Sequence, residues 1–483
     1  MSSSLSPQRL ARLLGDFDRS PAYRGLRDAL VELIGDGRIP IGTRLPSERS
    51  VTHVLEVSRT TVTRAYSDLV ECGFATARQG SGTFATVPHE RRRAHDRALR
   101  PFDMAQQGQG AIDLNVAASA ATPGVAAAYE RALAALPAYL GTDGYLPSGL
   151  PELQAMVARS YDARGLPTQP EQIVITSGAL SGIAVVARAL SRPGDRIMVE
   201  TPVYSNAIEA LRLGGGRLVS SPLADSLGEE GWDLEGVEAT LRQTAPHLAY
   251  LIPDFQNPTG FLMSDPDRER YARALRATRT TAIVDETLHA TGLIEEPMPA
   301  PFAAHATDAI TIGSASKMFW GGLRVGWIRA PWHLSDRIVS ARVHLDLGSS
   351  LFDQLVVTEL ITRSDILPRR REILRDRRDT LAEALQTHLP EWRFRLPEGG
   401  LALWVQLPDG SATRLAADLE REGVHLAPGP VFTVEGGSDT WLRIPYTKPE
   451  DQLLTAVERM AASWQRSTAT PGAPREPGRV LIA

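Results

Sequence analysis

Apolar and polar positions in the first hundred residues predict three short helices followed by a β-hairpin. Residues 21–34 carry apolar side chains at helical spacing, and Gly35 follows as a stop signal. Ser47 is placed to cap a second helix, and Ser58 a third. The apolar face predicted for the first helix consists of Tyr23, Leu26, Leu30, Leu33 and Ile34.

The third helix combines an apolar stripe with a polar N-terminal end. Arginine and threonine side chains crowd its outward side just after Ser58. A recognition helix presents its N-terminal residues to DNA, so two helices joined by a tight turn here indicate a helix-turn-helix. The alternative is a small three-helix bundle with a solvated charged face. The predicted buried stripe is Val62, Ala65, Tyr66, Leu69 and Val70.

Residues 73–86 alternate around a glycine-rich tip, which predicts a β-hairpin. The tip of this hairpin could enter a minor groove as a wing. Residues 88–110 keep no apolar period, which predicts a mobile linker. The run Arg91-Arg92-Arg93 within it could contact DNA phosphates nonspecifically, but a solvated linker is favoured.

From Ile112 onward, short apolar runs separated by helix-length segments or loops predict a largely parallel α/β sheet buried on both faces. Ligands of open α/β sheets bind beyond the carboxyl ends of the strands. The residues that follow these runs are therefore the candidates for a site. The runs are residues 173–176, 196–200, 248–252, 281–285 and 309–313.

Lysine usage singles out one of those residues. Lys317 is one of only two lysines in the chain, the other being Lys448, and the remaining basic residues are arginines. Arginine stays protonated and cannot form an imine, whereas a lysine with a lowered pKa can. Lys317 is thus a candidate for covalent chemistry, and a surface lysine in a loop is the alternative.

The residues at the strand ends together meet the requirements of pyridoxal phosphate. Lys317 would form the Schiff base, and Asp285 would supply the carboxylate that keeps the pyridine nitrogen protonated. Tyr204 would pack on the ring, and Asn257 would donate a hydrogen bond to its phenolic oxygen. A helix N-terminus and small polar residues suit the phosphate. The phosphate candidates are Ser177, Gly178, Ala179, Ser314 and Arg324.

Composition narrows the class of protein further. A length of 483 residues suggests two or three domains, and the apolar and charged fractions are typical of a soluble globular protein. No stretch is apolar enough for a membrane span or a signal core, so a cytoplasmic protein is expected. Cys72 is the only cysteine, which excludes an intrachain disulfide and a cysteine metal cluster.

Charge is distributed unevenly between the two regions. Residues 1–100 contain sixteen arginines and eleven acidic residues, a surplus of five positive charges. Because the whole chain carries −5, the remainder carries −10. A basic N-terminal region on an acidic body fits a local nucleic-acid contact surface.

Three stretches of the N-terminal region resemble the winged helix-turn-helix of the GntR regulators. They are residues 42–49 (Gly-Thr-Arg-Leu-Pro-Ser-Glu-Arg), 57–62 (Val-Ser-Arg-Thr-Thr-Val) and 78–84 (Arg-Gln-Gly-Ser-Gly-Thr-Phe). The match covers residues 20–87. The resemblance implies that operator DNA is contacted by Arg49, Arg59, Thr60, Thr61, Arg64 and the wing tip at Gly80.

The ordered set of cofactor candidates is similar to that of the fold-type-I aminotransferases, over residues 112–465. This resemblance implies that Tyr145 reaches the phosphate of the partner subunit's cofactor. It also implies that Arg443 binds the α-carboxylate of an amino acid, for which bidentate arginine geometry is suited. The alternative for Arg443 is a surface strand residue.

Together the two regions resemble the MocR subfamily of GntR regulators, in which an aminotransferase-like domain senses ligands for a DNA-binding domain. The resemblance implies a homodimer, typically head-to-tail. Two departures bear on turnover and effector choice. The tyrosine that the family commonly carries two residues after the pyridine-binding aspartate is Thr287 here, and common glutamines are replaced by Leu180 and Ser181.

We therefore expect a GntR-type winged helix-turn-helix at residues 20–87, a flexible linker at 88–111, an α/β fold-type-I aminotransferase-like domain at 112–465 and a disordered tail at 466–483. The expected protein is a cytoplasmic transcription regulator rather than an enzyme. It would bind operator DNA and pyridoxal 5'-phosphate, and would respond to the cofactor or to an amino-acid effector. The alternatives are a working aminotransferase with an accessory DNA-binding domain, and a repressor whose large domain is only a dimerisation scaffold.

Overall fold

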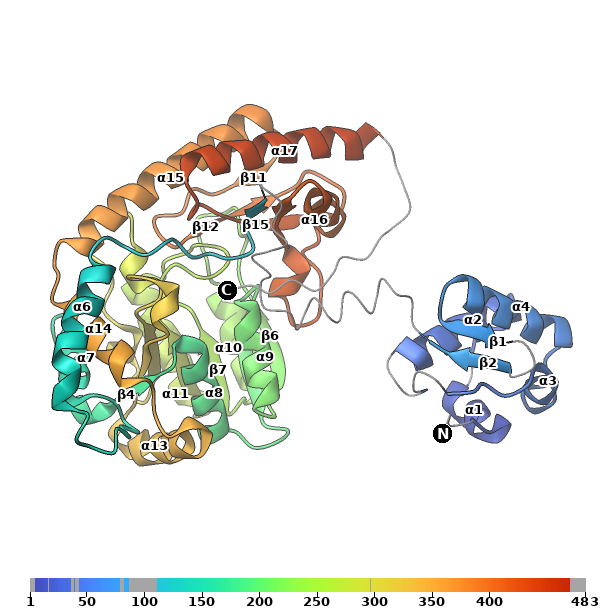
Figure 1. Ribbon diagram of the computed structural model, residues 1–483, viewed down its shortest axis with the longest axis horizontal. Helices are drawn as coiled ribbons and strands as arrows, with labels where there is room; N and C mark the ends of the chain where they lie inside the picture. The colour runs from blue at the N-terminus through green and yellow to red at the C-terminus, as the bar shows by residue number, and fades with distance from the viewer. Residues whose placement is uncertain are drawn as a thin grey trace. The chain divides into compact units, whose positions relative to one another are not determined.

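The computed structural model describes residues 5–15, 17–35, 39, 43–78, 82–86, 111–295 and 297–469 (Figure 1). The chain divides into two compact units, Met1–Met104 and Ala105–Ala483. This division falls within the predicted linker, whose residues 88–110 lie outside the described part. The predicted tail lies outside it from residue 470 onward, and helix α17 (Glu450–Ala469) runs past the predicted boundary at 465.

The described residues of the first unit form four helices and an antiparallel hairpin. The Oγ atoms of Ser47 and Ser58 accept backbone N–H groups of Ser50 and Thr61 at 3.3 and 3.0 Å, so both predicted caps are confirmed. The three predicted helices and the hairpin strands are confirmed as well. The elements are α1 (Pro7–Leu14), α2 (Ala22–Gly35), α3 (Glu48–Leu55), α4 (Arg59–Glu71), β1 (Ala75–Arg78) and β2 (Gly82–Ala85).

Two features of this unit differ from the sequence-based picture. Helix α1 precedes the predicted start at residue 20, and its Leu10 and Leu14 are buried in the same core as Leu26 and Leu30 of α2. Val70 was expected in the buried stripe of α4 but is 39% exposed. At 100° per residue it falls on the margin of that stripe, so it lies at the edge of the packed face.

The second unit is built on a seven-stranded sheet in the order β4-β10-β9-β8-β7-β5-β6. Neighbouring strands run parallel, except that β10 is antiparallel to both β4 and β9. The five predicted strands are confirmed, whereas β6 and β10 were not predicted. The strands are β4 (Ile173–Thr176), β5 (Arg196–Thr201), β6 (Arg217–Pro222), β7 (Leu248–Leu251), β8 (Thr281–Asp285), β9 (Ile310–Ser314) and β10 (Gly326–Arg329).

Helices cover both faces of this sheet (Figure 1). Alternate side chains of one strand enter different cores: Ile173 and Ile175 pack on one face and Val174 on the other. The first face is covered by α6 (Val125–Ala135), α7 (Pro151–Asp162), α10 (Leu234–Thr244), α11 (Asp265–Thr278), α12 (Phe302–His305) and α14 (Leu351–Ile361). The second is covered by α8 (Ala179–Leu190), α9 (Ser205–Leu213) and α13 (Trp332–Asp346).

A smaller antiparallel sheet, in the order β11-β12-β15-β14, forms the C-terminal part with α15, α16 and α17. The bounds are β11 (Arg393–Phe394), β12 (Ala402–Gln406), β14 (Ala427–Pro428), β15 (Trp441–Pro445), α15 (Ile366–His388) and α16 (Ala412–Arg421). Strand β3 (Ile112–Asp113) pairs with β13 (Val424–His425), which fixes the start of the unit to this part. Short 3-10 helices include η3 (His289–Thr291) and η4 (Gly321–Leu323).

Within the described ranges, no helix combines the length and the apolarity that crossing a membrane requires. The same part of the chain brings together no group of three or more His, Cys, Asp or Glu side chains that could hold a metal ion.

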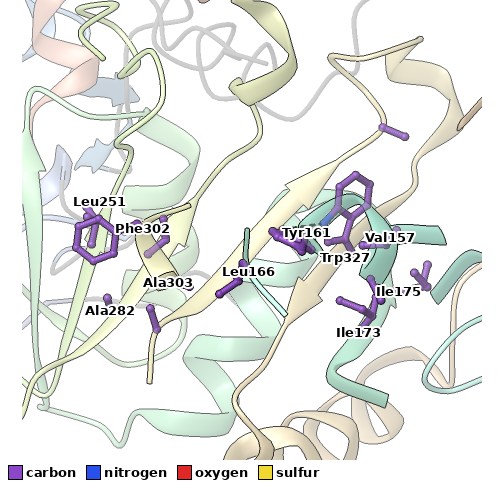
Figure 2. Close-up of a cluster of buried hydrophobic side chains, with 14 of the residues drawn as sticks. Val157, Tyr161, Leu166, Ile173, Ile175, Leu251, Ala282, Phe302, Ala303 and Trp327 are labelled. Carbon is purple, nitrogen blue, oxygen red and sulfur yellow. Dashed lines mark hydrogen bonds between the residues drawn. The ribbon is translucent and has the colours of Figure 1, made fainter. Parts of the chain in front are cut away.

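Figure 2 shows Trp327 of β10 beside Tyr161 of α7 in the core on the first face of the sheet. The Trp327 Nε1–H donates to Tyr161 Oη at 3.2 Å. Trp327 pairs with Gly313 of β9, and a Cβ at position 313 would lie 2.3 Å from the indole ring. Glycine is therefore required at 313, because the indole occupies the space of its side chain.

We expect Trp327→Ala to lower the free energy of unfolding of the second unit by about 3–5 kcal/mol, because it removes a large buried ring and a hydrogen-bond donor. Urea denaturation of the full chain, followed by far-ultraviolet circular dichroism, measures the change. The matched control is Trp332→Ala, whose ring is 59% exposed, and it should change the value by less than about 0.5 kcal/mol. Equal effects of the two substitutions would contradict this packing.

Candidate functional site

A cavity of about 290 Å³ lies where the parallel strands of the large sheet end. Its walls come from the segments that follow β5, β7, β8 and β9, from the start of α8 and from the segment before β12. Parallel strands bring their carboxyl ends to one edge of the sheet, which is why these segments meet. The predicted site residues that line the cavity are Ala179, Tyr204, Asn257, Asp285, Ser314, Lys317 and Arg324.

The other predicted cofactor and effector residues are placed in two ways. Ser177 and Gly178 contact Arg324, and Arg443 contacts Asn257, so these three lie directly behind the wall. Tyr145 is 63% exposed and does not line the cavity.

Lys317 follows β9 and presents a half-buried amine to the cavity. Its Nζ donates to the backbone carbonyl of Ala117 at 3.0 Å. Desolvation, reinforced by the charges of Arg443 and Arg324, lowers the pKa of Lys317 to about 8. A lysine with this pKa is partly neutral near pH 7 and is therefore nucleophilic. The alternative of an ordinary surface lysine is wrong.

Asp285 ends β8 and is buried. Its Oδ2 accepts the hydroxyl of Tyr250 at 2.7 Å, and its Oδ1 accepts the backbone N–H of Thr287 at 2.8 Å. Burial raises the pKa of Asp285, while these hydrogen bonds and the charge of Lys317 oppose the shift. The carboxylate therefore faces a cavity in which a cationic partner would stabilise its charge.

Glycines close one corner of the cavity around Arg324. The Arg324 Nη2 donates to the backbone carbonyl of Ser177 at 3.1 Å. A Cβ on Gly178, which has φ +93°, would lie 2.5 Å from that same Nη2, and a Cβ on Gly326 would lie 2.6 Å from the backbone of Gly178. The start of α8 and a guanidinium are thus held together, as an anion such as phosphate requires.

Arg443 lies in the middle of β15 and its side chain has no exposed surface. Its Nη2 donates to the backbone carbonyl of Asn115, its Nη1 approaches Asn257 Oδ1 at 3.5 Å, and the ring of Phe432 lies 5.0 Å away. Burial lowers the pKa of Arg443 to about 10. The strand assignment is confirmed and the surface alternative is wrong, because the guanidinium is buried behind the cavity.

Several polar atoms around the cavity lack a hydrogen-bond partner in the described part of the chain. They include the hydroxyl of Ser316, which lines the cavity, and the Nε of Arg443. Buried polar atoms are normally paired, so unpaired ones facing a cavity indicate a polar ligand. A lysine amine, a carboxylate, an anion corner and a spare hydroxyl together fit pyridoxal phosphate.

A buried ion network behind the cavity joins the loop of Asn257 to the loop of Asp285. Asp254 accepts from Arg268 at 2.5 Å and from His289 Nδ1 at 2.9 Å. Burial alone would raise the pKa of Asp254, but Arg268 and His289 reverse the shift and lower it. Glu286 pairs with Arg164 at 2.7 Å beside it. The network therefore keeps both loops in fixed positions.

Sequence reasoning missed three residues that shape this cavity: Ala117, Tyr250 and Ser316. A backbone carbonyl such as that of Ala117 leaves no signature in a sequence. Tyr250 sits inside an apolar strand, and only the alternation of strand side chains could have placed it beside Asp285. Ser316 directly precedes Lys317 in the sequence, but the direction of its side chain follows from the fold alone.

The first unit carries the predicted DNA-binding residues Arg59, Thr60, Thr61 and Arg64 on α4, and Arg49 on α3. The Ser58 Oγ that caps this helix also lies 2.8 Å from the hydroxyls of both Thr60 and Thr61. The guanidinium of Arg64 lies 4.0 Å over the ring of Tyr23. Thr61 is half-buried and the rest are exposed, while Gly80 lies outside the described residues. The exposed members are Arg49, Arg59, Thr60 and Arg64.

Residues 124–460 match the aminotransferase class I and II family, and residues 22–85 match the gntR family of bacterial regulatory proteins. A 2-aminoadipate transaminase of Thermus thermophilus is 31% identical over 331 residues, which cover 67% of this chain and 80% of that protein. An HTH-type transcriptional regulator of Bacillus subtilis, YdfD, is 26% identical over 459 residues, covering 89% of this chain and 94% of that one. The probable rhizopine catabolism regulatory protein MocR of Rhizobium meliloti is 28% identical over 398 residues, covering 77% and 78%.

A solved structure extends the likeness to three dimensions. The crystal structure of an α-aminoadipate aminotransferase of Thermus thermophilus, complexed with N-(5'-phosphopyridoxyl)-L-leucine, superposes with a TM-score of 0.68 at 28% identity. The alignment covers 79% of this chain and 100% of that one. The predicted fold class and the predicted cofactor, pyridoxal phosphate, are thereby confirmed. The chain belongs to the class I and II aminotransferase family and carries a GntR-type DNA-binding domain before it, the domain architecture of MocR-type regulators.

Proposed function

We propose that this chain is a transcription regulator that binds operator DNA through its first unit and senses pyridoxal phosphate and an amino acid through its second. The observation that carries the proposal is the presence, in one chain, of an exposed helix-turn-helix surface and a complete set of amine, carboxylate and anion-binding groups. When bound, the cofactor supplies an aldehyde that can combine with the amine of Lys317 or of an amino acid.

Each group of the cavity has a defined task in this proposal. Lys317 provides an amine that is partly neutral near pH 7, because desolvation and nearby guanidinium groups disfavour its protonated form. Asp285, which accepts a hydrogen bond from Tyr250, would stabilise the proton on the pyridine nitrogen. Arg324 and the start of α8 would hold the phosphate. Arg443 binds the α-carboxylate of the amino acid in place of the carbonyl of Asn115.

The first unit supplies the DNA contact. Exposed Arg49, Arg59 and Arg64 provide charge for phosphates and hydrogen-bond donors for base edges, and the hydroxyl of Thr60 adds a short polar contact. The angle between α3 and α4 is supported by a 2.7 Å hydrogen bond from Thr63 to Glu48. The regulator would act in the cytoplasm.

The regulator is proposed to act as a head-to-tail homodimer, in which Tyr145 reaches the cofactor phosphate of the partner subunit. Exposed apolar side chains near Tyr145 support this part of the proposal. Leu140 is 71% exposed, and the backbone beside Leu347, itself 45% exposed, approaches the carbonyl of Leu146. Exposed apolar side chains of this kind are suited to association.

A working aminotransferase is the second candidate, because the cavity keeps Lys317, Asp285 and Arg443 together. Steady-state turnover distinguishes the two functions. Transamination at about 1 per second or faster with a common amino donor and keto acid would favour the enzyme. A slow single exchange of amino groups without turnover would favour the sensor.

The decisive experiment titrates the purified protein against the DNA upstream of its own gene, with and without pyridoxal phosphate, at several salt concentrations. The proposal expects an affinity well above that for random DNA, and a change in that affinity with the cofactor or with an amino acid. Absence of specific binding under all conditions would refute the regulator and leave the aminotransferase.

We expect Lys317→Ala to abolish the visible absorption band that pyridoxal phosphate acquires on covalent attachment to a lysine. In the unaltered protein the rate of attachment should rise with pH through about 8 and then level off, because the neutral amine reacts and the pKa of Lys317 is lowered to that value. Stopped-flow absorbance over a pH series measures this. A midpoint near 10.5, the ordinary lysine value, would contradict the desolvated site.

We expect Arg59→Ala to weaken operator binding by about 1–3 kcal/mol if the side chain contacts a base edge, or to reduce the salt slope by about one if it contacts a phosphate. Fluorescence anisotropy with labelled operator DNA at several salt concentrations separates the two effects. Arg12→Ala, which removes an exposed arginine of α1, is the matched control and should leave both quantities unchanged. Equal losses of operator affinity in the two variants would contradict the contact between α4 and DNA.

A further inference from the structure

Arg370 of α15 is a buried cation near the cavity whose charge neither the cofactor nor an α-carboxylate would neutralise. Its side chain is 7% exposed, and no ion pair within the described ranges includes it. Among the described residues, its Nε has no hydrogen-bond partner, and its Nη2 reaches only the hydroxyl of Ser119, at 3.4 Å. The Nε of this guanidinium is thus buried without a partner, and the one hydrogen bond that the group makes within the described residues is long and goes to a neutral hydroxyl.

Neighbouring arginines on the same helix show that burial does not by itself leave Arg370 in this state. Arg375 donates to the carbonyl of Leu293 at 2.6 Å, Arg377 to that of Thr447 at 3.0 Å, and Arg378 to that of Pro397 at 2.8 Å. Each of these side chains has a close backbone acceptor. Arg370 has none in the part of the chain that the structure describes, and its position is less exposed than theirs.

The positive charge of Arg370 acts on the reactive amine. Its positive charge is one of the influences that lower the pKa of Lys317, after desolvation, Arg443 and Arg324. Burial itself, followed by the charge of Arg377, lowers the pKa of Arg370 to about 10. A buried charge without a partner is unfavourable, so an anion bound here would stabilise the folded unit.

One segment of chain connects Arg370 with the other cations of the site. The carbonyl of Asn115 accepts from Arg443, the carbonyl of Ala117 accepts from Lys317, and the hydroxyl of Ser119 accepts from Arg370. The three cations thus contact alternate residues of this segment. Asn115 and Ser119 are separated by four residue steps, which span at most about 14 Å. The segment therefore connects Arg443, which lies behind the cavity wall, with Arg370.

The charges of the ligands complete the argument, which rests on the proposed function. The phosphate of the cofactor accounts for Arg324, and the α-carboxylate of an amino acid accounts for Arg443. We propose that Arg370, together with the hydroxyl of Ser119, binds a second carboxylate, so that the effector is an amino dicarboxylic acid. A neutral amino acid would leave Arg370 without an anion, whereas a second carboxylate supplies one and can accept from Ser119 as well.

The test measures ligand affinity by isothermal titration calorimetry of the full-length, cofactor-loaded protein. L-Glutamate is compared with L-glutamine, and L-aspartate with L-asparagine, since each pair differs in charge and hardly in shape. We expect at least one acid to bind about 10- to 100-fold more tightly than its amide, the range typical of hydrogen bonds to a charged group. Arg370→Gln should reduce that ratio to near one.

Arg369→Gln is the matched control, because it removes the adjacent but exposed arginine of the same helix. It should keep the preference for the acid. Equal affinities within both pairs, or a preference that survives Arg370→Gln, would overturn the inference and leave amino-acid sensing itself intact. Absence of binding by all four amino acids would overturn both the inference and the proposed amino-acid effector. The proposed binding of operator DNA and attachment of the cofactor to Lys317 are tested by the separate experiments described above.

A second variant covers the case in which Arg370→Gln does not fold. Ser119→Asp places a carboxylate beside the guanidinium that Ser119 now contacts at 3.4 Å. This internal partner would neutralise Arg370, and the ratio between acid and amide should again fall to near one. A ratio that stays at the unaltered value in this variant would overturn the inference.

Discussion

Unbalanced positive charge around the Lys317 amine is the constraint on which the second unit depends. Lys317, Arg324, Arg370 and Arg443 come from four different elements, and the carboxylates that act on this group are Asp285 and Asp113. Holding the buried guanidinium groups of Arg370 and Arg443 away from water is unfavourable by several kcal/mol, a large part of a total stability of about 5–15 kcal/mol. Anionic ligands therefore stabilise this unit when they bind, and the protein can respond to them thermodynamically.

The contacts of these cations suggest how occupancy could reach the rest of the chain. Arg443 and Lys317 donate to the carbonyls of Asn115 and Ala117, so a ligand that takes over either donor competes with the chain itself. These residues directly follow β3, the first strand of the second unit, which is fixed to β13. An effector changes DNA affinity only through its different affinity for two arrangements, and replacement of these hydrogen bonds provides such a difference.

The parts of this structure that were predictable are those with a local chemical signature. Ser47 and Ser58 indicate the starts of their helices, because the N-cap position favours a side-chain oxygen that accepts a backbone N–H. The five apolar runs indicate strands that are buried on both faces. Helix α1 has such a signature as well, since Ser6 caps it and Pro7 begins it. Strand β10 has almost no such signature, because four residues beside a glycine-rich stretch are too few to show an alternation of apolar and polar positions. The site divides in the same way: Lys317 was found because its functional group is distinctive. Arg370 could not be found, because it lies in a run of three arginines and only the fold decides which of them is buried.

The substitution that separates this cavity from its family bears on the choice between sensing and turnover. Thr287 lines the wall with a hydroxyl where tyrosine is common, and an aliphatic hydroxyl is a much weaker acid than a phenol. A weaker donor stabilises less of the negative charge that develops on a reacting cofactor, and stabilisation of that charge is a main source of catalytic rate. The binding groups Arg324 and Arg443 are kept. A site that keeps its affinity for the ligand but stabilises the reacting cofactor less converts the bound ligand more slowly. The complex with the ligand then lasts longer, which suits a regulator.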